Sequence, residues 1–140
     1  MKHPEFQSAL MFFVCFASLV SASSADTSDT RSGKRIVVEN YYYARPGKAE
    51  EVYQWRLHAS DVRAKLGLPK GRVLKRVSQP AGGPDSTDLP DVVWECEYPS
   101  LAARNDDVER LGKRAEFEQV EKHMDTLIRR FERAIFELTD

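Results

Sequence analysis

The spacing of apolar residues in the first half of the chain changes from that of a strand to that of a helix. Residues 36–43, IVVENYYY, are rich in β-branched and aromatic side chains, which predicts a strand. A Pro-Gly pair at residues 46–47 then predicts a turn. Between residues 48 and 66 the apolar positions recur at three- and four-residue steps, as on one face of a helix: Val52, Trp55, Ala59, Val62 and Leu66. Gly67 suits the left-handed position that follows a helix.

The second half of the chain predicts two strands followed by two helical segments. Apolar and polar residues alternate over residues 72–79 and 91–98, and a loop rich in Pro, Gly and Asp joins them at residues 80–90. Ser100 suits a helix N-cap, and the helical pattern that follows is interrupted near Gly112. The second segment again has apolar residues at helical steps: Phe117, Val120, Met124, Leu127 and Phe131.

The C-terminal stretch FERAIFEL fits two structures. Leu127, Phe131, Ala134 and Leu138 would continue the helical stripe, whereas Ala134, Phe136 and Leu138 would form one face of a strand. Periodicity alone does not decide between them. With a last strand, the order of elements is that of an α+β, ferredoxin-like βαββαβ domain. Such a domain has a four-stranded antiparallel sheet with helices on one face, the second helix being broken near Gly112.

The N-terminal residues have the pattern of an export signal. Lys2 and His3 precede an apolar run from Ala9 to Val20, which is too short to span a bilayer. Small residues follow, so we expect residues 1–25 to be a cleaved signal peptide and the protein to be periplasmic or secreted. Residues 26–35 read as a flexible polar leader and residues 36–140 as one domain. After cleavage, no membrane association is expected.

Charge and cysteine content narrow the classes of partner. The chain has 21 basic and 22 acidic residues, and removal of residues 1–25 takes away one of each. Such a balanced charge argues against a nucleic-acid partner. Cys96 is the only cysteine left after cleavage, so no intramolecular disulfide is expected, and its alternation with Trp94 and Tyr98 suggests a small buried apolar side chain.

Two stretches of the chain resemble the dimeric α/β-barrel superfamily, which includes antibiotic-biosynthesis-monooxygenase-like and NIPSNAP-like proteins. The first is ENYYYARPGKAEEVYQW, where a strand ends in a Pro-Gly turn before a helix, and the second is VVWECEYPSLAARNDDVERLGKRAEFEQVEKHM. The resemblance implies a fourth strand over residues 131–138. It also implies a homodimer in which the sheet face carrying Tyr41 and Tyr43 packs against a second copy, because those rings would otherwise lie on an open sheet.

Haem-degrading members of this superfamily resemble the chain at Glu39-Asn40. They also have a Trp and a His in the second helix, where this sequence has Leu111 and Glu121. The haem-degrading set is therefore incomplete, and no cofactor is expected. The two histidines after residue 25, His58 and His123, lie on separate helices without metal-ligand spacing, so no metal site is expected either.

We expect a cavity between the helices and the sheet, lined by Asn40, Tyr42, Trp94 and Arg56. Such a cavity would bind a small apolar or aromatic ligand. Two alternatives remain open: a cofactor-independent monooxygenase or isomerase, as the resemblance implies, and a structural module whose side chains fill the cavity. Arg56 and Arg63 both lie near the apolar stripe of their helix. Their guanidinium groups are expected in water, with a carboxylate-binding role in the cavity as the alternative.

Acidic and basic residues also alternate along the predicted strands. Glu39, Glu95 and Glu97 would share one sheet face with Arg72 and Arg76. Such an arrangement is typical of cross-strand charge pairs on a wet or dimer-facing surface rather than of acid–base catalysis, which needs a closed pocket.

Overall fold

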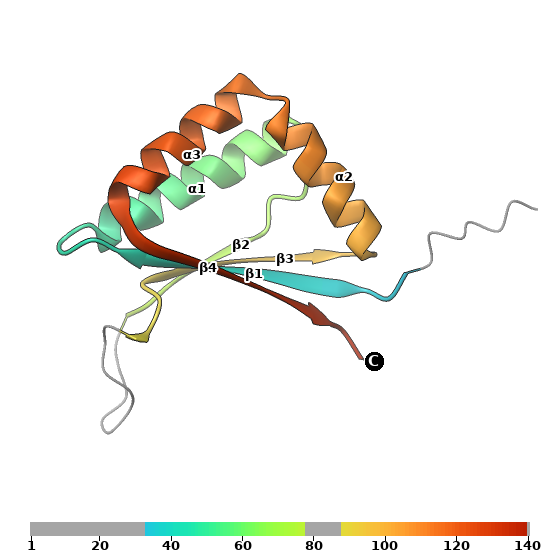
Figure 1. Ribbon diagram of the computed structural model, residues 1–140, viewed down its shortest axis with the longest axis horizontal. Helices are drawn as coiled ribbons and strands as arrows, with labels where there is room; N and C mark the ends of the chain where they lie inside the picture. Colours follow the sequence, from blue (N-terminus) through green and yellow to red (C-terminus); the bar gives the residue numbers. More distant parts are fainter. Residues whose placement is uncertain (1–32, 78–87, 140) are drawn as a thin grey trace, which may run out of the picture.

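The computed structural model describes residues 33–77 and 88–139. The expected signal peptide, most of the leader and most of the loop at residues 80–90 lie outside the described residues. No helix in the described part of the chain is long and apolar enough to cross a membrane. Figure 1 shows the helices gathered on one side of a single twisted sheet.

The described residues form four strands and three helices, with the sheet order β2-β3-β1-β4 and every neighbouring pair antiparallel. This arrangement confirms the α+β, ferredoxin-like prediction. In chain order the elements are β1 (Ile36–Ala44), α1 (Ala49–Lys65), β2 (Arg72–Lys75), β3 (Val92–Tyr98), α2 (Leu101–Gly112), α3 (Ala115–Leu127) and β4 (Ile128–Glu137).

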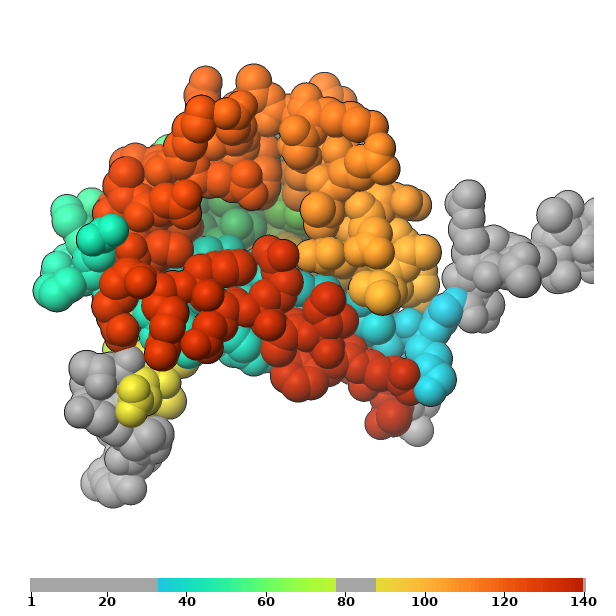
Figure 2. Space-filling model, viewed as in Figure 1, coloured from blue at the N-terminus to red at the C-terminus, as the bar shows by residue number. Residues whose placement is uncertain are grey.

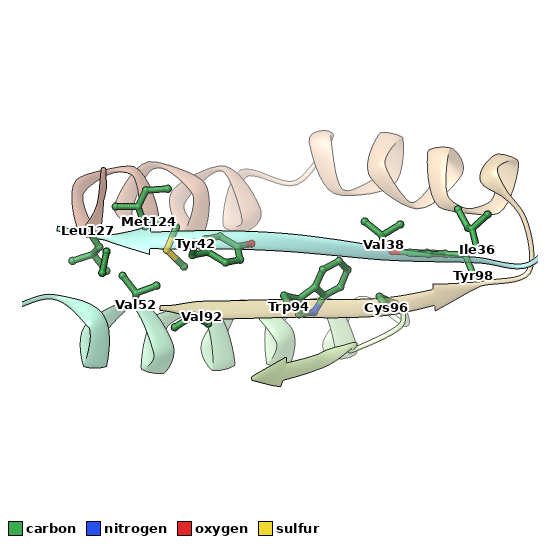
Figure 3. Close-up of a cluster of buried hydrophobic side chains, with 12 residues drawn as sticks. Ile36, Val38, Tyr42, Val52, Val92, Trp94, Cys96, Tyr98, Met124 and Leu127 are labelled. Carbon is green, nitrogen blue, oxygen red and sulfur yellow. The ribbon is translucent and has the colours of Figure 1, made fainter. Parts of the chain in front are cut away.

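Strict alternation along β1 and β3 places one set of side chains under the helices. Asn40 lies directly opposite Trp94 in the ladder, and Val38 lies opposite Cys96. Figure 3 shows side chains of both strands directed into the core, where helix residues meet them. The buried set on the helix side of these two strands comprises Ile36, Val38, Asn40, Tyr42, Val92, Trp94, Cys96 and Tyr98. Val52 of α1 is fully buried against it.

The chain between α1 and β2 contains two glycines with positive φ. Gly67, at φ 71°, follows the C-terminus of α1 as expected, and nothing lies within 4 Å of the position that a Cβ would occupy there. Gly71, at φ 70°, lies next to the Nε1 side of the Trp94 indole. A Cβ on Gly71 would lie 2.5 Å from Trp94 Cε2 and 2.8 Å from the Glu95 carbonyl oxygen. Gly71 therefore allows the backbone to approach this tryptophan.

Two element boundaries differ from the sequence prediction. The strand expected over residues 72–79 ends at Lys75, because its partner β3 begins only at Val92, the residue that pairs with Lys75. The helical stripe expected to reach Phe131 ends at Leu127, and β4 begins at the next residue without a loop. The Leu127 carbonyl accepts a hydrogen bond from the Arg45 backbone N–H at 2.9 Å, which ties this junction to the turn after β1.

The sheet face opposite the helices carries both charged and apolar side chains. Arg72 pairs with Glu95 at 2.5 Å across the ladder, as expected, whereas Glu39 accepts from the Tyr41 hydroxyl. Tyr43 is only 4% exposed within the single chain, because the Arg130 guanidinium lies 3.7 Å from its ring centroid. The expectation that Tyr43 needs a second copy to cover it is therefore wrong.

Candidate functional site

A cavity of about 390 Å³ lies between the sheet and the helices. It is within the size range of small-molecule sites, at the lower end. Figure 2 shows the hollow between β4 below and the α2–α3 pair above, with atoms of α1 visible deep inside it. Apolar side chains from both strands and helices supply much of its wall: Val38, Trp94, Val108, Leu111, Phe117, Val120, Met124, Ile128 and Phe131.

The structure brings the four sequence-predicted residues to this one cavity. Asn40, Tyr42 and Trp94 reach it from the helix side of β1 and β3, and Arg56 reaches it from α1. Strand alternation explains the first three, because each lies an even number of residues from the other helix-facing positions of its strand, Val38 of β1 and Val92 of β3 among them. Tyr42 packs edge-on against Phe131 of β4, with the ring centroids 5.3 Å apart.

Arg56 is buried rather than extended into water. It is only 5% exposed, so the expectation that its guanidinium is solvated is wrong. One terminal nitrogen donates to Ser60 Oγ at 3.3 Å, and buried Nε has no hydrogen-bond partner. Burial lowers the pKa of Arg56, and the nearby Tyr42 side chain opposes this shift. Because arginine stays charged in proteins, the cavity wall contains a buried cation whose partners among the described residues are neutral groups.

Arg63 is equally buried, at 4% exposure, but it is well partnered. Its Nε donates to the Pro69 carbonyl at 2.8 Å, and a terminal nitrogen donates to the Tyr98 hydroxyl at 2.8 Å. Asp107 of α2 lies 3.8 Å from the guanidinium. Burial raises the pKa of Tyr98 to about 12, although Arg63 acts in the opposite direction. Arg63 thus joins α1, α2 and β3 around the cavity.

The Trp94 ring is the common surface on which both buried arginines pack. The guanidinium carbons of Arg56 and Arg63 lie 5.0 Å and 4.9 Å from its ring centroid, within the range of cation–π contacts. The indole Nε1 donates to the Lys70 carbonyl at 3.0 Å, which fixes the ring plane beside Gly71. The two positive charges are therefore held by a single aromatic platform.

Further charged side chains of the cavity wall were missed at the sequence level. Arg133 of β4 donates through Nε to Asn40 Oδ1 at 2.7 Å, and Arg104 comes from α2. Burial lowers the pKa of Arg133, and Arg104 adds to this effect. Two carboxylates, Glu121 and Asp125, come from α3. The lining thus has more positive than negative side chains. Strand alternation would have placed Arg133 on the Asn40 face, had the ladder of β4 been known.

The positions compared with haem-degrading proteins also reach this cavity. Leu111 and Glu121 both line it, in place of the Trp and His that those proteins have. A leucine side chain and a carboxylate cannot supply the imidazole ligand that a haem iron takes from histidine.

The other candidate residues lie away from the cavity. His58 and His123 are exposed and flank Trp55, with ring centroids 4.7 Å and 4.3 Å from it. Within residues 33–77 and 88–139, no three His, Cys, Asp or Glu side chains are grouped to hold a metal ion. Cys96 is buried in the core, and burial raises the pKa of its thiol, so its reactive thiolate form is disfavoured.

Comparison with solved structures identifies proteins that share this fold. A NIPSNAP family protein from Agrobacterium tumefaciens superposes with a TM-score of 0.56 at 21% identity, covering 77% of this chain and 89% of that one. A dimeric ferredoxin-like protein of unknown function from Bacteroides fragilis gives 0.54 at 14% identity, covering 74% and 96%.

An antibiotic-biosynthesis-monooxygenase-like protein from Bacteroides thetaiotaomicron gives a TM-score of 0.50 at 14% identity, covering 76% of this chain and 90% of that one. No protein-family model and no curated protein sequence matches the chain. The domain therefore has the fold of NIPSNAP-like and monooxygenase-like proteins, as the sequence resemblance implied.

Proposed function

We propose that this protein is an exported homodimer that binds a small apolar or aromatic ligand in the cavity between its helices and its sheet. The observation that carries this proposal is the convergence of Asn40, Tyr42, Arg56 and Trp94 on one cavity of about 390 Å³. A mostly apolar wall with a few fixed polar groups is typical of ligand sites, because the apolar part supplies affinity and the polar groups supply orientation.

A thermal-shift and native mass-spectrometry experiment tests ligand binding. A protein purified from its own host should carry a discrete extra mass, and the isolated ligand should raise the melting temperature of ligand-free protein. At a hundredfold excess over Kd the expected stabilisation is about 2.7 kcal/mol. If the host-purified protein has no extra mass and small aromatic compounds leave the melting temperature unchanged, a purely structural domain is the better account.

A second copy would cover the sheet face opposite the helices. The support is the fold shared with a dimeric protein, together with exposed apolar side chains on this face. Leu74 and Phe136 are 42% and 47% exposed there, and Tyr41 lies between them, half-buried. Large apolar side chains left in water on an open sheet favour association.

Two neighbouring residues of β4 provide a matched test of this dimer. Phe136 pairs with Val37 on the open face, whereas Ile135 pairs with Val38 on the helix face, and the two have similar exposure. Phe136→Lys should shift the mass measured by light scattering from dimer to monomer, while Ile135→Lys should leave the dimer intact. A wild-type monomer, or an equal effect of both substitutions, would rule out this interface.

Catalysis without a cofactor is the second candidate function. It is favoured by the fold shared with a monooxygenase-like protein and by the two polar side chains, Asn40 and Tyr42, beside apolar walls. Because Asn40 already accepts from Arg133, Asn40→Ala should also release that arginine. For an enzyme, this variant should keep its melting temperature within a few degrees but lose turnover of aromatic substrates. If the wild-type protein turns over no aromatic substrate, binding remains the function.

A further inference from the structure

The cavity wall has a charge that the chain itself does not neutralise. Among the described residues, no carboxylate lies within 4 Å of the Arg56 guanidinium, although this side chain is 5% exposed. Its Nε is buried without a partner, and its other polar contacts are with neutral hydroxyls, a long one with Ser60 Oγ at 3.3 Å and one with the Tyr42 side chain. A buried cation in this state costs free energy, and an anion beside it would recover part of that cost.

Arg63, the neighbouring arginine in the same cavity wall, has the polar partners that Arg56 lacks. Arg63 packs on the same Trp94 ring but has the Pro69 carbonyl, the Tyr98 hydroxyl and, at 3.8 Å, Asp107. The contrast between the two side chains is therefore one of partners, not of burial. Arg56 has the free donor capacity, whereas Arg63 is used to hold the wall together.

The remaining charges favour an anion over a neutral or cationic ligand. Two carboxylates line the cavity, Glu121 and Asp125 of α3. Four arginines also line it: Arg56, Arg63, Arg104 and Arg133. Arg133 is held toward the cavity by Asn40 Oδ1, which accepts from its Nε at 2.7 Å. A single negative charge on the ligand would suit this excess, while the apolar wall formed by residues such as Met124 and Phe131 would hold an apolar body.

We propose that the ligand of this cavity is a carboxylic acid with an aromatic or apolar body, whose carboxylate binds Arg56. A guanidinium matches a carboxylate because its planar donors can form two parallel hydrogen bonds. The inference deepens the proposed ligand-binding function and rests on it. Asn40 has a positioning role here, because it orients Arg133 at the same cavity.

Two probes of the same shape separate this inference from the proposal on which it rests. 3-Phenylpropanoate and 3-phenylpropanamide have the same aromatic body and nearly the same volume, but only the first is charged. Isothermal titration calorimetry on the purified full domain should give roughly 10- to 100-fold tighter binding of the carboxylate, the range expected for a charge-assisted pair. Equal binding of both probes would overturn the inference and keep the ligand cavity. Binding of neither would overturn both.

Variants assign the charge preference to Arg56. Arg56→Met should remove the preference for the carboxylate while leaving the amide affinity within about threefold, a tolerance set by ordinary packing changes. Arg45→Met changes an exposed arginine in the turn after β1 and should leave the preference unchanged. Arg56→Lys should keep part of it, since the charge remains but the planar donors are lost. A preference that persists in Arg56→Met would overturn the assignment, and the wild-type comparison decides the proposal even if this variant does not fold.

Discussion

The packing of Gly71 against Trp94 allows the contribution of one steric contact to be measured. Gly71→Ala would place a methyl group 2.5 Å from Trp94 Cε2 and 2.8 Å from the Glu95 carbonyl oxygen, at a backbone φ of 70°. An L-residue in this left-handed conformation costs about 1–2 kcal/mol. Overpacking adds about 1–3 kcal/mol. The free energy of unfolding should therefore fall by about 2–5 kcal/mol.

Gly67→Ala is the control, because it has the same backbone geometry without the contact. Its φ is 71°, and nothing lies within 4 Å of the added atom. Only the backbone cost of about 1–2 kcal/mol is expected there. Any entropy that alanine removes from the unfolded chain is common to both variants. The difference between them, about 1–3 kcal/mol, isolates the contact with the tryptophan and the neighbouring strand.

Urea unfolding followed by tryptophan fluorescence measures both variants. With a slope of about 1–3 kcal/mol per molar urea, a difference of about 2 kcal/mol separates the midpoints by roughly 1 M. All proteins are compared at one concentration, since dimerisation would make the midpoints concentration-dependent. Because Trp94 supports both buried arginines, Gly71→Ala should also weaken 3-phenylpropanoate binding, whereas Gly67→Ala should not. Equal midpoints for the two variants would refute the packing described here.

Three further measurements test the buried polar groups and the core. Arg63→Met should lower the free energy of unfolding by about 2–4 kcal/mol, because it removes two charge-assisted hydrogen bonds, one of them to Tyr98. The hydrogen bond to Glu39, with burial, raises the pKa of Tyr41 to about 12. Its stabilising contribution should be complete below about pH 10 and lost as the pH rises toward 12, so wild-type stability should fall more steeply there than that of Tyr41→Phe. Val52→Ala, at a fully buried position, should cost about 2–3 kcal/mol in the same urea assay, and a cost below about 0.5 kcal/mol would contradict its place in the core.

The alternation of side chains along the strands predicted most of the fold and much of the candidate site. The pattern of β1 and β3 assigned Asn40, Tyr42 and Trp94 to one face, and only the helices remained to be placed over it. A period of two leaves a strand residue on one of two faces, so a correct strand assignment fixes the direction of every side chain. This is why three of the four expected residues could be brought together before the structure was known.

The direction of Arg56 on α1 and the extent of the last strand, β4, were harder to predict from the sequence. Arg56 lies at the border of the apolar stripe of α1, where a long side chain can turn either toward water or inward. Its burial depends on the Trp94 ring of a distant strand, which local spacing does not describe. Arg133 was missed because residues 127–138 fit both periods, and its partner Asn40 becomes evident only from the β1–β4 register.

The direct passage from α3 into β4 makes a wall of the cavity continuous with the edge of the sheet. Leu127 ends the helix and Ile128 begins the strand, so no flexible residues separate Met124 on one side of the cavity from Phe131 on the other. The two elements are joined without a loop, and the Arg45 backbone N–H bonds to the Leu127 carbonyl at their junction. Because no loop separates them, we expect a ligand that displaces α3 to displace β4 as well, the strand that bears Phe136. Ligand binding and dimerisation would then both depend on the position of β4. If ligand binding changes the affinity of the dimer, dimerisation must change the affinity for the ligand by the same factor.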